Sequence, residues 1–174
     1  MPQNQLPGPL PRIGLGYDSH RLGGNGPLRI GGIDVPSAFS AIGHSDADVV
    51  LHALVDALMG AIAGPDIGRL FPDDADENRG RDSADFLTEA CRRVDAAGHA
   101  IGNIDGVILA QRPKMAPHID AMRTRIAALC GLDASSVGLK AKTGEGVGEI
   151  GTSVAIAARM VVLLVPMTAA DAAT

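Results

Sequence analysis

Apolar residues alternate with small or polar ones near the start of the chain. From residue 13 to residue 19 the apolar side chains fall on odd positions, at Ile13, Leu15 and Tyr17. The even positions hold two glycines, followed by Asp18 and His20. A period of two is typical of a β-strand, whose successive side chains point to opposite faces. The pattern therefore predicts a core strand that carries Asp18 and His20 on one face, where the neighbouring glycines leave room above the sheet.

Three longer segments repeat apolar residues at the spacing of an amphipathic helix, over residues 46–62, 83–98 and 118–131. Ser45 is the expected N-cap of the first helix, with Asp48 three residues later in the capping-box position. Ser83 is the expected cap of the second helix, and Gly98 ends it. The apolar residues of the third helix share one face, at Ile119, Met122, Ile126 and Leu129.

Shorter apolar runs predict the remaining strands, at residues 27–35 (a hairpin), 103–111, 135–143 and 152–165. The last run is apolar on both faces, which favours a central strand, although its Ala-rich first half is also compatible with a helix. The order ββααβαββ predicts one α+β domain over residues 13–166, with helices packed on one face of a mixed sheet. Residues 1–12 are rich in proline and have no apolar run, so we expect a mobile leader rather than a signal peptide. Residues 167–174 are expected to form a loose tail.

Composition supports a single soluble, cytoplasmic domain. The 174 residues are 46% hydrophobic but only 2% aromatic, so aliphatic side chains must form the core. The net charge is -5 and the Lys and Arg residues are scattered, which argues against a nucleic-acid-binding face. No segment has the length of a membrane span. Cys91 and Cys130 lie in predicted helices outside any Cys-x-x-Cys pair, which favours buried, reduced thiols.

Asp18 and His20 are candidate metal ligands, because residues two apart on a strand direct their side chains to the same side. His52, on the first predicted helix, is a third candidate. Two His and one carboxylate leave one tetrahedral position open, as in catalytic zinc sites. The alternative is an Asp–His ion pair at a strand end, and spacing alone does not separate the two.

Two further patterns could hold phosphate. His44 and Ser45 precede a predicted helix, whose N-terminus offers free N–H groups, although simple capping by Ser45 explains the same residues. The glycine loop over residues 144–151 could direct backbone N–H groups at an anion. It contains a Gly-x-Gly-x-x-Gly match, but no helix, second strand and acidic residue follow as a dinucleotide site requires. The acidic run near Asp74 lacks the glycine and the glutamate that a calcium-binding loop requires. Residues 110–118 by themselves indicate only a turn stiffened by proline.

Four motifs occur together in a fixed order: "GLGYDSHRL", "GHSDADVVLHALVDALMGAIAGPDIGRLFPDDAD", "AQRPKMAPHI" and "KAKTGEGVG". In combination they resemble the 2-C-methyl-D-erythritol 2,4-cyclodiphosphate synthase family, from about residue 12 to residue 165. The resemblance implies a homotrimer with active sites between subunits. It also implies a CDP-linked methylerythritol phosphate as substrate, whose 2-phosphate attacks the β-phosphate, closes a cyclic diphosphate and releases CMP for the non-mevalonate isoprenoid pathway. No protein nucleophile is needed, because a phosphate monoester is largely dianionic at neutral pH.

The resemblance also implies roles for residues. Zinc would be bound by Asp18, His20 and His52, and magnesium or manganese on the substrate diphosphate by Glu145. His44 and Thr143 would stabilise the transition state. The resemblance implies further substrate-binding residues. Ser45 lies beside the helix start, the ribose would be bound by Asp66, Ile67 and Gly68, and the erythritol phosphate would be bordered by Phe71, Pro72, Asp73, Asp74 and Ala75. The cytosine would be held, largely through backbone groups, by Ala110, Gln111, Arg112, Pro113, Lys114, Met115 and Ala116.

The phosphate loop departs from the family pattern. Members often carry two or three threonines before the glutamate, whereas this chain has Lys142, Thr143 and Gly144. Lys142 could replace the lost hydroxyl as a phosphate contact. Glu149 stands where many members have an aromatic residue, and Thr152 where many have an arginine. That arginine faces a cavity at the trimer centre that takes isoprenoid diphosphates, so its absence argues against such a ligand here.

Two other functions are compatible with the same residues. The altered loop could belong to a trimer that binds nucleotide without turnover. A metal-dependent phosphohydrolase would use a similar ligand set, and it would release inorganic phosphate.

Overall fold

A five-stranded mixed sheet forms the centre of the computed structural model, which describes residues 9–72 and 74–167. The strands lie in the order β4 (Ser40–Ile42), β1 (Arg12–Gly23), β7 (Ala155–Pro166), β5 (His99–Leu109) and β6 (Val137–Lys142). The β5–β6 pair is parallel and the others are antiparallel. The prediction that the last apolar run is a central strand is therefore confirmed. The predicted hairpin is also present, as β2 (Leu28–Ile30) and β3 (Ile33–Val35).

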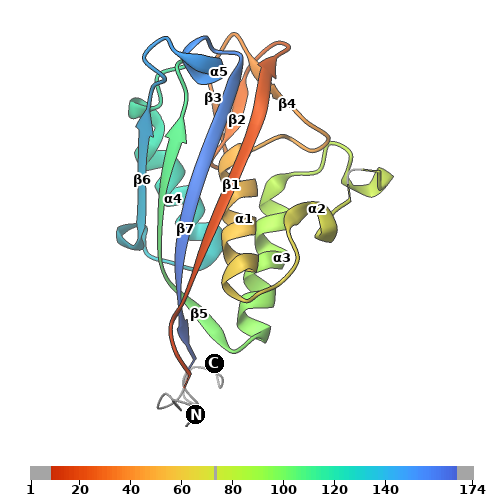
Figure 1. Ribbon diagram of the computed structural model, residues 1–174, viewed down its shortest axis with the longest axis vertical. Coiled ribbons are helices and arrows are strands. Elements are labelled where there is room, and N and C mark those ends of the chain that lie inside the picture. Colours follow the sequence, from red (N-terminus) through yellow and green to blue (C-terminus); the bar gives the residue numbers. More distant parts are fainter. Residues whose placement is uncertain (1–8, 73, 168–174) are drawn as a thin grey trace, which may run out of the picture.

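The three long helices pack on one face of this sheet, as predicted (Figure 1). They are α1 (Val49–Ala61), α3 (Ser83–Ala96) and α4 (Ile119–Cys130). Short helical segments fill the connections: α2 (Ile67–Leu70), η1 (Asp76–Asn78), η2 (Ala116–His118), η3 (Ala134–Ser136) and α5 (Gly148–Gly151). The predicted glycine loop thus ends in a short helix. The chain forms one α+β domain, and no helix of its described part is long and apolar enough to cross a membrane.

The two faces of β1 are used differently from the prediction. The apolar odd face is exposed, with Ile13 73% and Leu15 67% accessible. The even face is buried against α1, and a Cβ atom on Gly14 or Gly16 would lie 1.8 Å from the carbonyl oxygen of Ala57 or Ala53. The glycines therefore leave no open room above the sheet, because the backbone of α1 fills that space. Gly14 and Gly16 instead set how closely the helix approaches the strand.

The helix caps also differ from the prediction. Asp48 caps α1, because its carboxylate accepts hydrogen bonds from the N–H groups of Val50 and Leu51. The same carboxylate accepts the N–H groups of Gly31 and Gly32 in the β2–β3 turn. Asp82 caps α3, and Ser83 is the first helical residue. Asp48 rather than Ser45 therefore satisfies two of the free N–H groups at the start of α1.

The core is aliphatic, as the composition requires. Its largest fully buried side chains include Leu51, Leu54 and Leu58 of α1, together with Ile104 and Ile156 from the sheet. Cys91 and Cys130 are free thiols, but they are half-buried rather than buried. The expectations for residues 1–8 and for the tail from 168 onward lie outside the described residues.

Candidate active site

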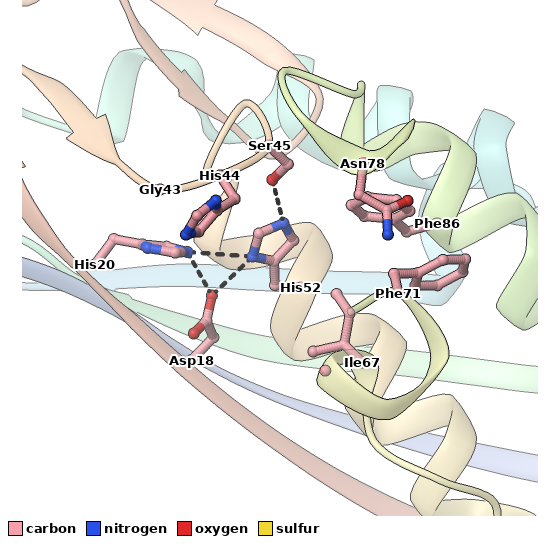
Figure 2. A pocket seen from close by; sticks show the side chains of 11 residues that line it. Asp18, His20, Gly43, His44, Ser45, His52, Ile67, Phe71, Asn78 and Phe86 are labelled. Carbon is pink, nitrogen blue, oxygen red and sulfur yellow. Dashed lines mark hydrogen bonds and ion pairs between the residues drawn. The ribbon is translucent and has the colours of Figure 1, made fainter. Parts of the chain in front are cut away.

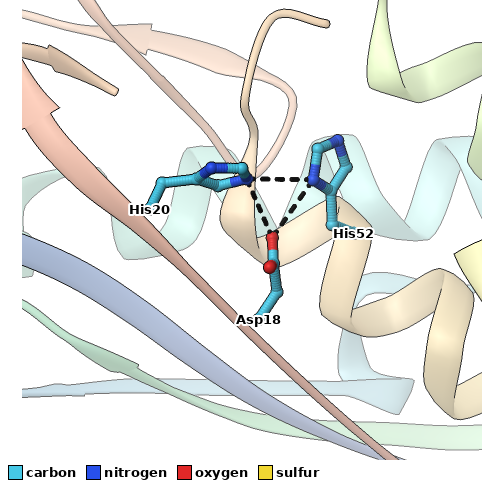
Figure 3. A group of neighbouring side chains, drawn as sticks. All are labelled: Asp18, His20 and His52. Atoms are coloured by element: carbon cyan, nitrogen blue, oxygen red, sulfur yellow. Dashed lines mark hydrogen bonds and ion pairs between the residues drawn. The ribbon is translucent and has the colours of Figure 1, made fainter. Parts of the chain in front are cut away.

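Three predicted metal ligands meet at the junction of β1 and α1 (Figure 3). The carboxylate Oδ2 of Asp18 lies 3.0 Å from Nε2 of His20 and 3.1 Å from Nδ1 of His52. The two ring nitrogens are 3.2 Å apart. One ligand atom from each residue therefore lies within 4.8 Å of the other two, which is suited to a shared metal ion. Spacing on β1 positions the first two ligands, and the glycine-mediated approach of α1 positions the third.

His20 is oriented by its second ring nitrogen. Its Nδ1 lies 3.2 Å from the carbonyl oxygen of Ile42 in β4. Because a carbonyl oxygen can only accept, Nδ1 carries a proton, and a neutral His20 ring then turns the lone pair of Nε2 toward Asp18. In that form a cation joins the Nε2 lone pair to the Asp18 carboxylate, and this cation is either a metal ion or the proton that makes His20 an imidazolium.

The cluster also shifts the acidities of its members. Burial would raise the pKa of Asp18, but hydrogen bonds and charge interactions with His20 and His52 lower that pKa well below its usual range. Burial would lower the pKa of His20, but the hydrogen bond and charge of Asp18 raise it. Asp18 is therefore an ionised carboxylate at neutral pH, which is the form that binds metal.

The cluster opens into a cavity of about 320 Å³ (Figure 2). Eight of its lining residues were predicted: Asp18, His20, His44, Ser45, His52, Ile67, Gly68 and Phe71. Three were missed: Gly43, Asn78 and Phe86. The rings of Phe71 and Phe86 stack with centroids 4.3 Å apart, and the guanidinium of Arg81 lies 5.1 Å from the Phe86 centroid. The cavity thus has a charged end at the ligands and an aromatic wall.

A second cavity, of about 580 Å³, lies beside the predicted proline-stiffened turn. The predicted residues Gln111, Arg112, Pro113, Lys114 and Thr143 line it, together with the unpredicted residues 36–39. The Oε1 atom of Gln111 is buried and has no hydrogen-bond partner among the described residues. The chain has three phenylalanines in all, and each lines one of the two cavities, a signal that the sequence offered.

Other predicted residues lie outside both cavity walls. Glu145 is exposed, has left-handed backbone (φ 50°) and accepts a 2.9 Å hydrogen bond from the Thr143 hydroxyl. Asp66 caps α2. Two other predicted residues, Ala110 and Met115, belong to the core, and Asp73 lies outside the described residues. The remaining predicted residues that line neither cavity are half-buried or exposed: Pro72, Asp74, Ala75, Ala116, Lys142, Gly144, Glu149 and Thr152.

Comparisons with known proteins agree on one family. Residues 11–165 match the YgbB family. The chain is 72% identical to the 2-C-methyl-D-erythritol 2,4-cyclodiphosphate synthase of Rhodopirellula baltica, over 88% of this chain and 92% of the relative. It resembles the Plasmodium falciparum IspF structure, a CDP complex, with a TM-score of 0.80 and 33% identity over 91% and 97% of the two chains. It also matches the bifunctional IspDF of Campylobacter jejuni, with a TM-score of 0.86 and 35% identity, over 89% of this chain but only 42% of that protein.

Proposed function

The chain belongs to the YgbB family and is a lyase-type cyclising enzyme, and on this premise we propose that it converts 4-diphosphocytidyl-2-C-methyl-D-erythritol 2-phosphate to 2-C-methyl-D-erythritol 2,4-cyclodiphosphate and CMP. This reaction belongs to the non-mevalonate route to isoprenoid precursors. The observation that carries the proposal is the convergence of Asp18, His20 and His52 at the mouth of a cavity. The high identity to a relative named for this activity supports it.

Asp18, His20 and His52 would hold zinc in this proposal, since two imidazoles and one carboxylate are a common ligand set for catalytic zinc. Zinc bound there supplies positive charge that offsets the charge of phosphate oxygens. The protein would hold the diphosphate between this cluster and His44, which lines the same cavity (Figure 2). The aromatic wall would border the methylerythritol portion and limit access of water.

The chemical step asks the protein for alignment rather than for a nucleophile. An oxygen of the 2-phosphate forms a bond to the β-phosphorus, and the bond from that phosphorus to the CMP oxygen breaks. Because the 2-phosphate is already largely dianionic, no side chain has to remove a proton. The contribution of the chain is to bring two negatively charged groups together and to stabilise their charge.

The second cavity would hold the nucleotide end. The turn over residues 111–114, which lines this cavity, would offer backbone groups to cytosine. Thr143 lines the same cavity and donates to Glu145, which would bind magnesium or manganese at the diphosphate. Lys142, next to Thr143, would add a phosphate contact in place of the threonine that is usual in the family.

A trimer would bring the two cavities of neighbouring subunits together. The sheet face opposite the helices is open in the single chain, and Leu15 and Val161, partners across β1 and β7, are 67% and 40% exposed on it. Exposed aliphatic and aromatic side chains in one patch are typical of a buried interface. We propose that this face lies at the centre of a homotrimer and that each active site combines the metal cluster of one subunit with the nucleotide cavity of the next.

The test is metal content together with product release. Purified protein should contain about one zinc per chain and should release CMP from the CDP-linked substrate when magnesium is present. Protein that binds no zinc and releases no CMP would refute the proposal. Nucleotide binding without CMP release would instead favour a non-catalytic trimer, and release of inorganic phosphate would favour a phosphohydrolase.

A further inference from the structure

The ring nitrogen of His52 that points away from the metal cluster has its own partners. Its Nε2 lies 2.8 Å from the hydroxyl oxygen of Ser83, the first residue of α3. The hydroxyl oxygen of Ser45 lies farther away, at 3.1 Å. Ser83 is fully buried and His52 is 8% exposed, so water does not readily replace these contacts. Neither the cavity nor the family resemblance includes Ser83.

The direction of the Ser83 hydrogen bond follows from Asp46. The Ser83 hydroxyl donates a hydrogen bond to Oδ1 of Asp46, and the Ser83 backbone N–H donates to Oδ2 at 3.1 Å. The other groups around this carboxylate are also donors: the N–H of Asp48 at 3.2 Å and Nε of Arg29 at 3.7 Å. Asp46 therefore acts only as an acceptor, and the single hydroxyl proton of Ser83 is committed to it. The lone pairs of Ser83 then face His52, so Nε2 must be the donor.

We propose that Ser83 and Asp46 are positioning residues that fix the neutral His52 ring with its proton on Nε2. The proposal rests on the proposed metal site but not on turnover. With the proton held on Nε2, the lone pair of Nδ1 points at Asp18 and His20 and is ready for a metal ion. The carbonyl oxygen of Ile42 likewise holds the proton of His20 on Nδ1, so both rings carry their protons on the side away from the metal cluster.

The competing tautomer shows why such a device is needed. Oδ2 of Asp18 lies 3.1 Å from Nδ1 of His52 and would accept a proton carried there. In the metal-free protein this contact favours the tautomer that blocks the ligand atom. The Ser83–Asp46 pair opposes it, because a proton on Nδ1 would leave the lone pairs of Nε2 and of Ser83 facing each other at 2.8 Å. Partners of metal-bound histidines commonly fix the tautomer in this way.

The direct test is the tautomer of His52 in metal-free protein above neutral pH. The chain has five histidines, so selective ¹⁵N labelling of the rings gives few signals, and His52→Gln identifies the relevant one. In the wild type we expect the Nε2-protonated form. In Ser83→Ala we expect a shift toward the Nδ1-protonated form, together with a loss of zinc affinity of about 10- to 100-fold in chelator competition. Asp46→Asn should act in the same direction, and it keeps the test available if Ser83→Ala does not fold.

Thr88→Ala is the matched control, because it removes a hydroxyl from the exposed side of the same helix. It should change neither the tautomer nor the zinc affinity. An Nδ1-protonated His52 in the wild type would overturn the proposal, as would an unchanged tautomer in both Ser83→Ala and Asp46→Asn. Since the tautomer is measured without metal or substrate, a failure of the proposed function would be a separate result.

Discussion

At the scale of single residues, the metal cluster was predictable in part. A period of two places Asp18 and His20 on one side of a strand, and the structure confirms this. That His52 completes the group depends on how α1 crosses β1, which spacing alone could not give. Asn78 and Phe86 were missed because tertiary packing of η1 and α3, rather than any local motif, brings them to the cavity.

His52→Ala should abolish zinc binding and reduce CMP release by about 100-fold or more, since loss of even an outer partner of a metal ligand costs 10- to 100-fold. The fold should be retained, because His52 contributes little to the aliphatic core. Metal analysis, a CMP-release assay and circular dichroism would check these outcomes. His118→Ala, which removes a histidine outside the cluster, is the control and should keep both zinc and activity. Full activity in His52→Ala would contradict the assignment.

Asp56→Asn should raise the melting temperature at neutral pH. Burial raises the pKa of Asp56, nearby Asp66 and Asp18 raise it further, and the Ile67 N–H, 2.8 Å away, only partly offsets this. A carboxyl whose folded pKa is raised costs stability once it ionises. The cost is absent below the ordinary value of 3.8, grows as pH rises through that value and is complete above the folded pKa.

Melting curves from acid to neutral pH would check this prediction. The difference between Asp56→Asn and wild type should vanish in acid. Asp56→Ala, which also removes the acceptor for Ile67, should be less stable than Asp56→Asn at every pH. Equal stability of Asp56→Asn and wild type at neutral pH would show that the buried charge carries no cost.

At the scale of elements, alternation predicts that β1 is a strand but not which face is covered. The sequence pairs bulky residues with one face and glycines with the other, and burial of the bulky face is the usual outcome. Here the helix backbone packs on the glycines instead, because a strand face without side chains allows a close approach. This approach brings His52 of α1 close to Asp18. The same limit applies to the caps: Ser45 fits the N-cap pattern, but contacts with the distant β2–β3 turn select Asp48.

Gly16→Ala should destabilise the protein by about 3 kcal/mol, the upper end of the usual cost of overpacking, because its new Cβ atom would meet the backbone of Ala53 at 1.8 Å. Gly60→Ala is the matched control in α1. Its Cβ atom would have its nearest neighbour at 3.9 Å, and alanine favours the helix by about 0.5–1 kcal/mol. Denaturant unfolding of both variants would measure the two effects. Similar stabilities of Gly16→Ala and Gly60→Ala would refute the close-packing interpretation.

At the scale of the whole molecule, the α+β class, the mixed sheet and its central strand followed from element order and from the apolar last strand. The assembly could not be predicted from the sequence, because an apolar strand face is equally compatible with a core and with an interface. In the single chain the predicted site residues that line a cavity are divided between two cavities that share no lining residue. The proposed trimer explains this division.

Leu15→Glu should prevent the proposed trimer from forming, because it places a charge in the apolar patch of β1. Analytical ultracentrifugation should then show a mass near 17.8 kDa, that of one chain, and CMP release should be lost. Ala121→Glu, on the exposed surface of α4, is the control and should keep the assembly of the wild type. An unchanged sedimentation mass for Leu15→Glu would place the interface elsewhere.

Co-expression of two inactive variants would test whether each site is shared. His52→Ala lacks a metal ligand, and Thr143→Ala lacks the hydroxyl in the nucleotide cavity. In randomly mixed trimers, about half of the metal clusters are intact, and about half of these face an intact nucleotide cavity, which restores about a quarter of wild-type activity. If both cavities of one chain formed one site, mixing would restore nothing.

The central position of β7 has a consequence for how the chain reaches this structure. Arg12 of β1 pairs with Leu164 of β7, and β5 pairs with the opposite edge of β7. Neither β1 nor β5 can complete its hydrogen bonds until β7 has been synthesised and inserted between them. Such non-local pairing slows folding relative to helical proteins. During synthesis on the ribosome, the edge of β1 that pairs with β7 therefore stays unpaired until the last strand has emerged.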